Sequence, residues 1–153
     1  MTSNHSIAVN VNHQIDLQAF DALQTCDDAQ FVAVVNLCFA TYAPQHTSVE
    51  ICLMGEAEHT LAHEKFLKDS SATDVMAFHY DDSDCCGELL VNVEMAMRRA
   101  PEFSHTAIEE LLLYVVHGTL HLLGFDDHQA DDIHKMRAAE SEIMQQAKEL
   151  NVF

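Results

Sequence analysis

The sequence predicts one α+β domain over residues 1–153, in which a small mixed sheet of about four strands is covered by about five helices. Two patterns indicate this fold class. Short apolar segments typical of strands alternate with segments of helical periodicity, and the last third of the chain is helical. In addition, 48% of the residues are hydrophobic and no repeat or Pro/Gly-rich linker divides them, which favours a single core.

Four segments are predicted to be strands. Residues 6–12 alternate apolar and polar side chains, which is the pattern of a half-buried strand. The other three segments are richer in apolar residues and cover residues 47–54, 73–80 and 87–94. The acidic residues Asp81, Asp82 and Asp84 separate the last two strands and predict a turn.

Helices are predicted where apolar residues recur every three or four positions, over residues 16–39, 56–67, 95–100 and 131–150, with a fifth helix before the last. The first segment is one broken helix or two. The second is polar enough to lie on the surface, with Leu61 and Phe66 facing inward. The inward stripe of the last helix is Ile133, Met136, Ile143 and Ala147. Loops are expected at residues 43–45 and 68–72.

The fifth helix is the best defined by its ends. Thr106, followed three residues later by Glu109, matches a capping box, and an apolar run over residues 111–116 follows at once. Gly124 is well placed to end the helix in the left-handed conformation. Because this helix is apolar on nearly every side, we expect it to be the central buried helix.

The charge balance restricts the partners. Seven Lys and Arg face 25 Asp and Glu, so the formal net charge is −18. Such a chain repels polyanions, and taken alone this balance argues against a nucleic-acid partner. A salt-adapted proteome or a tight basic groove inside an acidic shell would reconcile the charge with RNA binding. We expect no membrane and no DNA partner.

The cysteines and the chain's N-terminus favour the cytoplasm. The five cysteines are odd in number and include no C-x-x-C, so neither a disulfide framework nor a thiolate zinc cage is expected. No apolar run approaches the roughly 20 residues that cross a bilayer. Residues 1–9 show no basic region followed by an apolar stretch, so no secretory signal is expected.

The end of the central helix carries the pattern of a metal site. His117 and His121 lie four residues apart, so both imidazoles project from one helix face and can reach one ion. Gly124 then allows the chain to turn back and bring a third ligand. The third ligand is Asp127 by its spacing of ten residues from the first histidine, with His128 as the alternative. We therefore predict one zinc ion per chain.

The residue directly after the first histidine argues against one class of zinc enzyme, the peptidases. Zinc peptidases with this helix place a Glu directly after the first histidine as general base, whereas this chain has Gly118. A peptidase mechanism therefore lacks its base here. Because a glycine inside a helix costs about 1 kcal/mol relative to alanine, we expect substrate or backbone to come close to the metal at this position.

The stretch 117–128 resembles the signature of the YbeY family. That signature runs H-G-x-L-H-L-x-G-[YF]-D-H, and residues 117–126 match it throughout. Residues 66–78, which include Asp69 and end in T-D-V-M-A-F, are similar to the family's segment ending T-[DN]-V-[LI]-[ST]-F. Gly87 and Glu88 resemble the start of its G-[ED]-[IL] strand. The resemblance implies a metal-dependent, hydrolase-like domain that cuts single-stranded RNA, with rRNA and ribosomal small-subunit components as partners in rRNA maturation and ribosome quality control.

Two positions depart from the family pattern. The family's usual third histidine falls on Asp127, with His128 displaced by one. Many members also carry an arginine after the aromatic residue of the central segment, where this chain has Leu67. A phosphate contact would then have to come from another cation, and the candidates are Lys65, Lys68 and Arg98.

The catalytic residues proposed from the sequence are Asp126 and His128, which lie beside the metal ligands and can move protons. Three other interpretations remain open. The chain can be a non-catalytic ribosome-assembly factor whose metal stabilises its C-terminal helices, or a zinc hydrolase of another substrate class, such as a peptidase. It can also be a plain helical core with hydrogen-bonded histidines and no metal.

Overall fold

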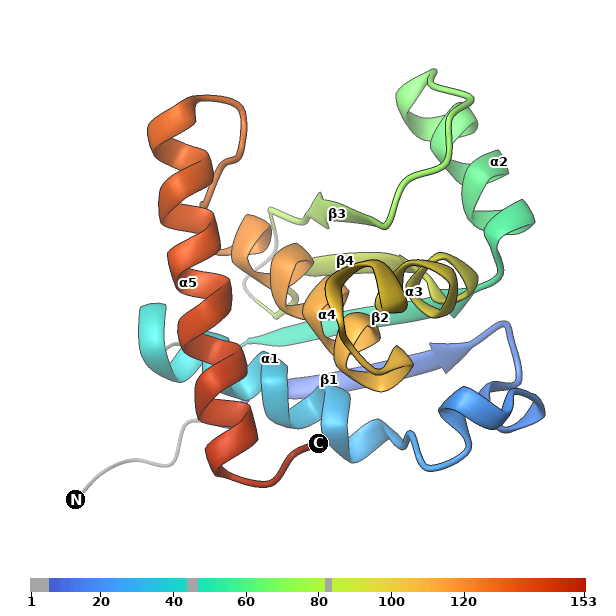
Figure 1. Cartoon of the computed structure of the whole chain (residues 1–153). Coiled ribbons are helices and arrows are strands. Elements are labelled where there is room, and N and C mark those ends of the chain that lie inside the picture. The colour runs from blue at the N-terminus through green and yellow to red at the C-terminus, as the bar shows by residue number, and fades with distance from the viewer. Residues whose placement is uncertain (1–5, 44–46, 82–83) are drawn as a thin grey trace.

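The structure is a computed structural model and describes residues 6–43, 47–81 and 84–153 (Figure 1). The elements in chain order are β1 (Ala8–His13), the 3₁₀ turns η1 (Leu17–Ala19) and η2 (Asp21–Leu23), α1 (Asp28–Tyr42), β2 (Ser48–Met54), α2 (Glu56–Leu67), β3 (Val75–His79), β4 (Gly87–Asn92), α3 (Val93–Arg99), η3 (Ala100–Phe103), α4 (Ala107–Leu122) and α5 (Ala130–Glu149). Every predicted strand falls on an observed one within two residues at each end.

The four strands form one mixed sheet in the order β1-β2-β4-β3. β1 and β4 run parallel to β2 on either side of it, with Val11 opposite Ile51 and Ile51 opposite Leu89. β3 is the antiparallel edge strand. Parallel neighbours require a crossover, which α1 supplies between β1 and β2, whereas β3 and β4 need only a short connection. Of the turn predicted in that connection, Asp82 lies outside the described residues, as do Pro44 and Gln45 of the predicted loop after α1.

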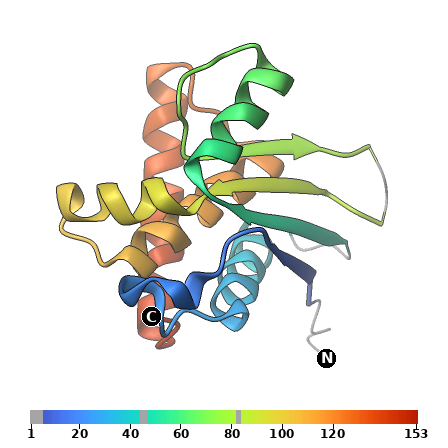
Figure 2. The same cartoon turned by 90° about the vertical axis from the view of Figure 1, so that its right-hand side faces the viewer.

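The two faces of the sheet are covered unequally. α1, α4 and α5 pack together over one face and enclose the main core (Figure 1). The other face carries only a small apolar cluster beneath α2, made of Cys52, Met54, Met76 and Leu90. In Figure 2 the twisted sheet lies in front, and α4 and α5 lie behind it. The five cysteines are free thiols. No described helix is both long enough and apolar enough to span a bilayer.

α4 is the central buried helix, as predicted. The hydroxyl of its N-cap residue Thr106 accepts a hydrogen bond from the amide of Glu109 at 3.1 Å. Leu111, Leu112 and Leu120 are fully buried among α1, α5 and the sheet. The helix ends at Leu122, and Gly124 follows with a φ of +97°, a conformation that side-chain-bearing residues rarely adopt. This turn sends the chain back across the end of α4.

The inward stripe predicted for α2 is wrong, and the one predicted for α5 is confirmed at Met136, Ile143 and Ala147 but not at Ile133. On α2, Leu61 and Phe66 are 67% and 54% exposed, and the helix instead buries His59 and His63. The imidazole of His59 is drawn inward because its Nε2 donates a hydrogen bond to the Leu90 carbonyl of β4 at 2.8 Å. On α5, Ile133 is exposed because the first turn of the helix lies outside the apolar layer, and burial begins at Met136.

Candidate metal centre

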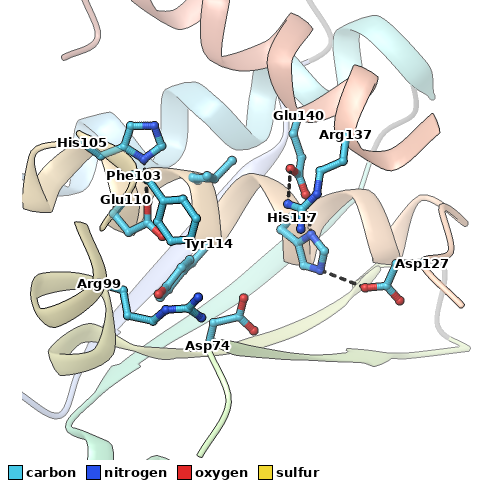
Figure 3. Close-up of a pocket in the computed structure, with 11 residues that line it drawn as sticks. Asp74, Arg99, Phe103, His105, Glu110, Tyr114, His117, Asp127, Arg137 and Glu140 are labelled. Atoms are coloured by element: carbon cyan, nitrogen blue, oxygen red, sulfur yellow. Dashed lines mark hydrogen bonds and ion pairs between the residues drawn. The ribbon is translucent and has the colours of Figure 1, made fainter. Parts of the chain in front are cut away.

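Two histidines of α4 and one aspartate after it converge at the end of the helix. The Nε2 atoms of His117 and His121 are 3.1 Å apart, and their rings meet edge to face. The turn at Gly124 brings Asp127 back over the helix, so that its Oδ2 lies 3.5 Å from each of these Nε2 atoms. The three ligand atoms therefore form a small triangle (Figure 3 shows His117 and Asp127).

The size of this triangle fits a metal ion. Ligand atoms bonded to one tetrahedral zinc at its usual bond lengths are about 3.3 Å apart, which lies between the 3.1 and 3.5 Å observed here. Two imidazole nitrogens and one carboxylate oxygen are also a donor set that zinc accepts. The described residues His117, His121 and Asp127 thus fit a metal by both chemistry and spacing, with room for a further ligand on the solvent side.

The orientation of His117 is fixed from behind by α5. Its Nδ1 lies 2.6 Å from Oε1 of Glu140, whose Oε2 accepts a hydrogen bond from Arg137 at 2.9 Å. A carboxylate only accepts, so Nδ1 carries the proton and the lone pair of Nε2 is directed toward Asp127 and His121. Residues behind the ligand thereby select the tautomer that can bind a metal.

The contact between His117 and Glu140 shifts the pKa of both groups. Burial lowers the pKa of His117, but the hydrogen bond to Glu140 and the carboxylates of Glu140, Asp74 and Asp127 outweigh it and raise that pKa overall. Burial likewise raises the pKa of Glu140, and the hydrogen bonds from His117 and Arg137 reverse this, so its pKa is lowered. Glu140 therefore remains a carboxylate although it is almost fully buried.

Sequence reasoning missed Glu140. The residue lies on the same face of α5 as Met136, Ile143 and Ala147, at helical spacing, and all four are buried. A carboxylate on an otherwise apolar stripe is a signal in the sequence, because an unpaired buried charge is too costly to be accidental. This signal indicates that Glu140 has a partner, but it does not identify the partner, because His117 lies 23 residues away.

The two residues predicted to be catalytic lie beside the triangle and not in it. Asp126 and His128 are partners of each other, with Oδ1 and Nε2 3.4 Å apart, and the His128 side chain is 81% exposed. Oδ1 of Asp126 also accepts a hydrogen bond from the amide of Asp127 at 2.8 Å. The residue that converges with both helix histidines is Asp127. Asp126, Asp127 and His128 form a second, more exposed group of possible ligands.

A polar cavity of about 550 Å³ adjoins the triangle and follows α4 toward its N-terminus. His117 and Asp127 form one end of it, and Tyr114 lies one turn of α4 away (Figure 3). The remaining lining residues named in Figure 3 are Asp74, Arg99, Phe103, His105, Glu110, Arg137 and Glu140.

The three cations proposed from the sequence do not line this cavity. Arg98 is engaged elsewhere, because its two terminal nitrogens each bond a carboxylate oxygen of Glu56 at 2.7 Å. The Lys65 ammonium lies over the Phe66 ring on α2. Among the described residues the cations that line the cavity are Arg99 and Arg137. Neither stood out in the sequence, because arginines on exposed helix faces are common.

Gly118 has a different role from the one predicted. A Cβ atom at this position would lie 2.9 Å from Cδ2 of Leu89 and 3.0 Å from Cγ2 of Val75. Glycine is therefore needed on the face of α4 that packs against strands β3 and β4. We expected substrate or backbone to come close to the metal at this position, whereas the structure places side chains of the sheet, Leu89 and Val75, against Gly118.

The fold and the site define a small α+β protein with a candidate metal centre beside a polar cavity. The chain belongs to a particular family of these proteins, because the family model described as Endoribonuclease YbeY matches residues 12–148. The resemblance to this family, which the stretch 117–128 and the T-D-V segment indicated, is therefore confirmed. It extends over nearly the whole chain.

Curated relatives agree with this assignment, and one solved structure shares the fold. The chain is 34% identical over 106 residues to Endoribonuclease YbeY of Nautilia profundicola, covering 68% of this chain and 73% of that protein. It is 39% identical over 97 residues to Endoribonuclease YbeY of Rhodopirellula baltica, covering 61% of this chain and 50% of that protein. The solution structure of TM1509 from Thermotoga maritima shares the fold, with a TM-score of 0.57, 21% identity and 94% of each chain covered.

Proposed function

We propose that the chain is a metal-dependent endoribonuclease that cuts single-stranded RNA in rRNA maturation and ribosome quality control. Endoribonuclease activity follows from the family. The observation that supports the metal-dependent mechanism is the convergence of His117, His121 and Asp127 beside an open cavity. We further propose zinc, one ion per chain, rRNA and small-subunit components as partners, and the cytoplasm as location, where five unpaired thiols remain reduced.

The chemistry would be divided between the ion and the chain's own residues. His117, His121 and Asp127 would hold a zinc ion, which would supply polarisation of a phosphoryl oxygen and a bound water with a pKa of about 7. Glu140 holds the His117 ring in the orientation that such binding requires, and Arg137 holds Glu140. Because the chain as a whole is strongly acidic, the ion would be the main source of positive charge for the scissile phosphate.

Proton transfer remains with the residues proposed from the sequence. Asp126 and His128 flank Asp127 and are accessible to solvent, so either can exchange a proton with water at the rim of the site. Their mutual contact allows a proton to be passed between the Asp126 carboxylate and the His128 imidazole.

The shape of the cavity favours a single strand. A volume of about 550 Å³ is sufficient for one nucleotide but not for a duplex. An enzyme with such a site acts on unpaired nucleotides, whose bases can leave the stack and enter the protein. The acidic surface is compatible with RNA only if contacts to a few nucleotides near the ion supply the affinity.

Two other candidate functions, a peptidase and a ribosome-assembly factor, can be distinguished from the nuclease by experiment. A peptidase needs a general base near the metal, but Gly118 stands in the expected position and Glu140 is engaged by His117 and Arg137. An assembly factor would use the ion to join the end of α4 to the segment that leads into α5. In that case removal of a ligand would unfold the protein and would abolish no cleavage activity.

The decisive measurement is cleavage of a single-stranded rRNA fragment by purified metal-loaded protein. We compare the wild type with His117→Ala and, as a matched control, with the exposed His134→Ala. We expect cleavage by the wild type and the control, no cleavage by His117→Ala, and similar circular dichroism spectra for all three. Unfolding of His117→Ala with no wild-type cleavage would favour the assembly factor. Cleavage of casein in place of RNA would favour the peptidase.

A further inference from the structure

The part of the cavity that lies away from the metal centre contains a buried hydroxyl without a partner. Tyr114 is 4% exposed, and its hydroxyl makes no hydrogen bond among the described residues. Figure 3 shows the Tyr114 ring between Phe103 and Arg99, in the cavity. A buried polar atom that is left unsatisfied costs about 1 to 3 kcal/mol, so a hydroxyl kept at this position indicates a ligand that satisfies it.

A free carboxylate oxygen faces the same space. Oδ1 of Asp74 accepts a hydrogen bond from the amide of Val75 at 2.8 Å, which fixes the orientation of the carboxylate at the start of β3. Among the described residues no hydrogen bond reaches its Oδ2. The Glu110 carboxylate, in contrast, is engaged by Nδ1 of His105 at 2.6 Å. Asp74 is therefore the acidic acceptor that remains available to a ligand.

A planar cation lies opposite this acceptor. Nε of Arg99 donates to Glu102 at 3.1 Å, which holds the guanidinium at the rim and leaves its two terminal nitrogens without a partner among the described residues. The same guanidinium lies 5.3 Å from the centre of the Phe103 ring, which is half-exposed at the mouth of the cavity. Arg99 and Phe103 thus present flat surfaces on which an aromatic ligand can stack.

The charge balance of this region excludes a phosphate as its main ligand. Asp74, Glu110 and Glu140 line the cavity against Arg99 and Arg137, and Arg137 is held by Glu140. A dianion placed here would be repelled by the carboxylates. A neutral, aromatic group with both N–H donors and acceptor atoms matches the lining, and in a strand of RNA that group is a base.

We propose that Asp74, Arg99, Phe103 and Tyr114 form a guanine-binding subsite that holds the base of a nucleotide next to the scissile phosphate. The inference deepens the proposed function and rests on it. The free Oδ2 of Asp74 accepts hydrogen bonds from N1–H and the N2 amino group of guanine, and the terminal nitrogens of Arg99 donate to O6 and N7. The Tyr114 hydroxyl completes the polar contacts, and Phe103 stacks on the ring.

Guanine is favoured over the other bases by its pattern of donors and acceptors. Arginine pairs with the O6 and N7 acceptors of guanine more often than with any other base edge. A carboxylate matches adjacent N–H donors, and guanine has two of them, at N1 and N2. Adenine and cytosine have an amino group but no adjacent N–H, and uracil has no amino group. A site that offers both a carboxylate and a guanidinium therefore selects guanine.

The first test measures binding of free nucleosides to the metal-loaded full chain by calorimetry. We expect guanosine to bind at least 10-fold more tightly than adenosine, cytidine or uridine, and inosine, which lacks the N2 amino group, to lose about 10-fold. Arg99→Gln should weaken guanosine binding about 10-fold and Tyr114→Phe about 3-fold, whereas Tyr80→Phe, just after β3, should leave binding unchanged. Because Asp74 also bonds the backbone of β3, Asp74→Asn is compared only if its thermal unfolding matches the wild type.

The second test uses single-stranded oligonucleotides that differ at one base, and it separates this inference from the proposed function. Preferred cleavage beside guanine, lost in Arg99→Gln, would support the subsite. Cleavage of RNA with equal rates at all four bases and no guanosine binding would overturn the subsite and leave the nuclease function intact. Selective guanosine binding by a protein that cuts no RNA would support the subsite and overturn the proposed function.

Discussion

His117 and Glu140 face each other from α4 and α5, with Nδ1 of the histidine 2.6 Å from Oε1 of the glutamate. The contact spans 23 residues of sequence and joins the candidate metal centre to the last helix. It fixes the tautomer of His117, so this one hydrogen bond both orients a candidate metal ligand and joins α5 to α4.

Loss of the Glu140 charge is expected to weaken metal binding. Glu140→Gln keeps the shape of the side chain and an acceptor for Nδ1 of His117 but removes the negative charge that makes the imidazole a better ligand. Groups that orient a metal ligand typically contribute 10- to 100-fold in affinity, so we expect a loss of about 10-fold for zinc, measured by chelator competition. The exposed Glu149→Gln is the matched control, and an unchanged affinity in Glu140→Gln would contradict the role assigned to this contact.

The identity of the third ligand is decided by two neighbouring substitutions. Asp127→Ala removes an oxygen that lies 3.5 Å from both histidine nitrogens, whereas His128→Ala removes a ring that is largely exposed. We expect about one zinc per chain, as predicted for a single site, in the wild type and in His128→Ala, and a loss of more than about 100-fold in affinity for Asp127→Ala. Elemental mass spectrometry after dialysis gives the metal content. The reverse result would make His128 the ligand.

A pH dependence of stability is expected from His59. Burial is the main cause that lowers its pKa in the folded protein, and the carbonyl of Leu90 and nearby carboxylates only partly offset it. The unfolded state, with an ordinary histidine pKa of about 6.5, therefore binds the proton more readily. The stabilising contribution is complete above that value and is lost as the pH falls through the folded pKa.

The substitution His59→Gln tests this directly. Glutamine can still donate to the Leu90 carbonyl but does not titrate, so the variant should lose less stability than the wild type between neutral and mildly acidic pH. Urea unfolding at several pH values measures the difference. The exposed His134→Gln should follow the wild type, and a His59→Gln curve parallel to the wild-type curve would show that another group causes the acid sensitivity.

Gly87 is expected to be essential for the packing of β3 against β4. A Cβ atom here would lie 2.3 Å from the carbonyl oxygen of Phe78 and 2.6 Å from a methyl group of Leu122. Backbone cannot move aside as a flexible side chain can, so Gly87→Ala should destabilise the fold by about 3 kcal/mol in urea unfolding. Gly124→Ala meets no neighbouring atom and suffers only its positive φ, which we expect to cost about 1 kcal/mol.

Much of the fold was predictable because its signals are local. Strand and helix periodicity, the cap at Thr106 and the glycine turn at Gly124 depend on residues a few positions apart, and the structure confirms them. The prediction of the inward stripe on α2 was wrong because no local signal specifies it. A helix with polar residues on most sides has no preferred inward face until a partner such as the Leu90 carbonyl selects His59.

The candidate metal triangle could also be predicted from the sequence, because its members lie within eleven residues of one another. The periodicity of α4 places His117 and His121 on one face, and the turn at Gly124 determines that the chain returns toward them. For the third ligand, the spacing in the sequence favoured Asp127 but left His128 as an alternative. One step along a loop changes the direction of a side chain completely.

The sequence by itself therefore determined the fold class, the strands and the candidate ligands near the end of α4, since short-range geometry is enough to specify each of them. Only the tertiary structure decided that Glu140 orients His117, that Gly118 serves the sheet, and that Arg99, Asp74 and Tyr114 share a cavity. These residues come from α3, α4, α5 and the segment before β3. Their meeting depends on how helices and strands pack, and packing is a property of side-chain volumes over the whole core, which no local pattern records.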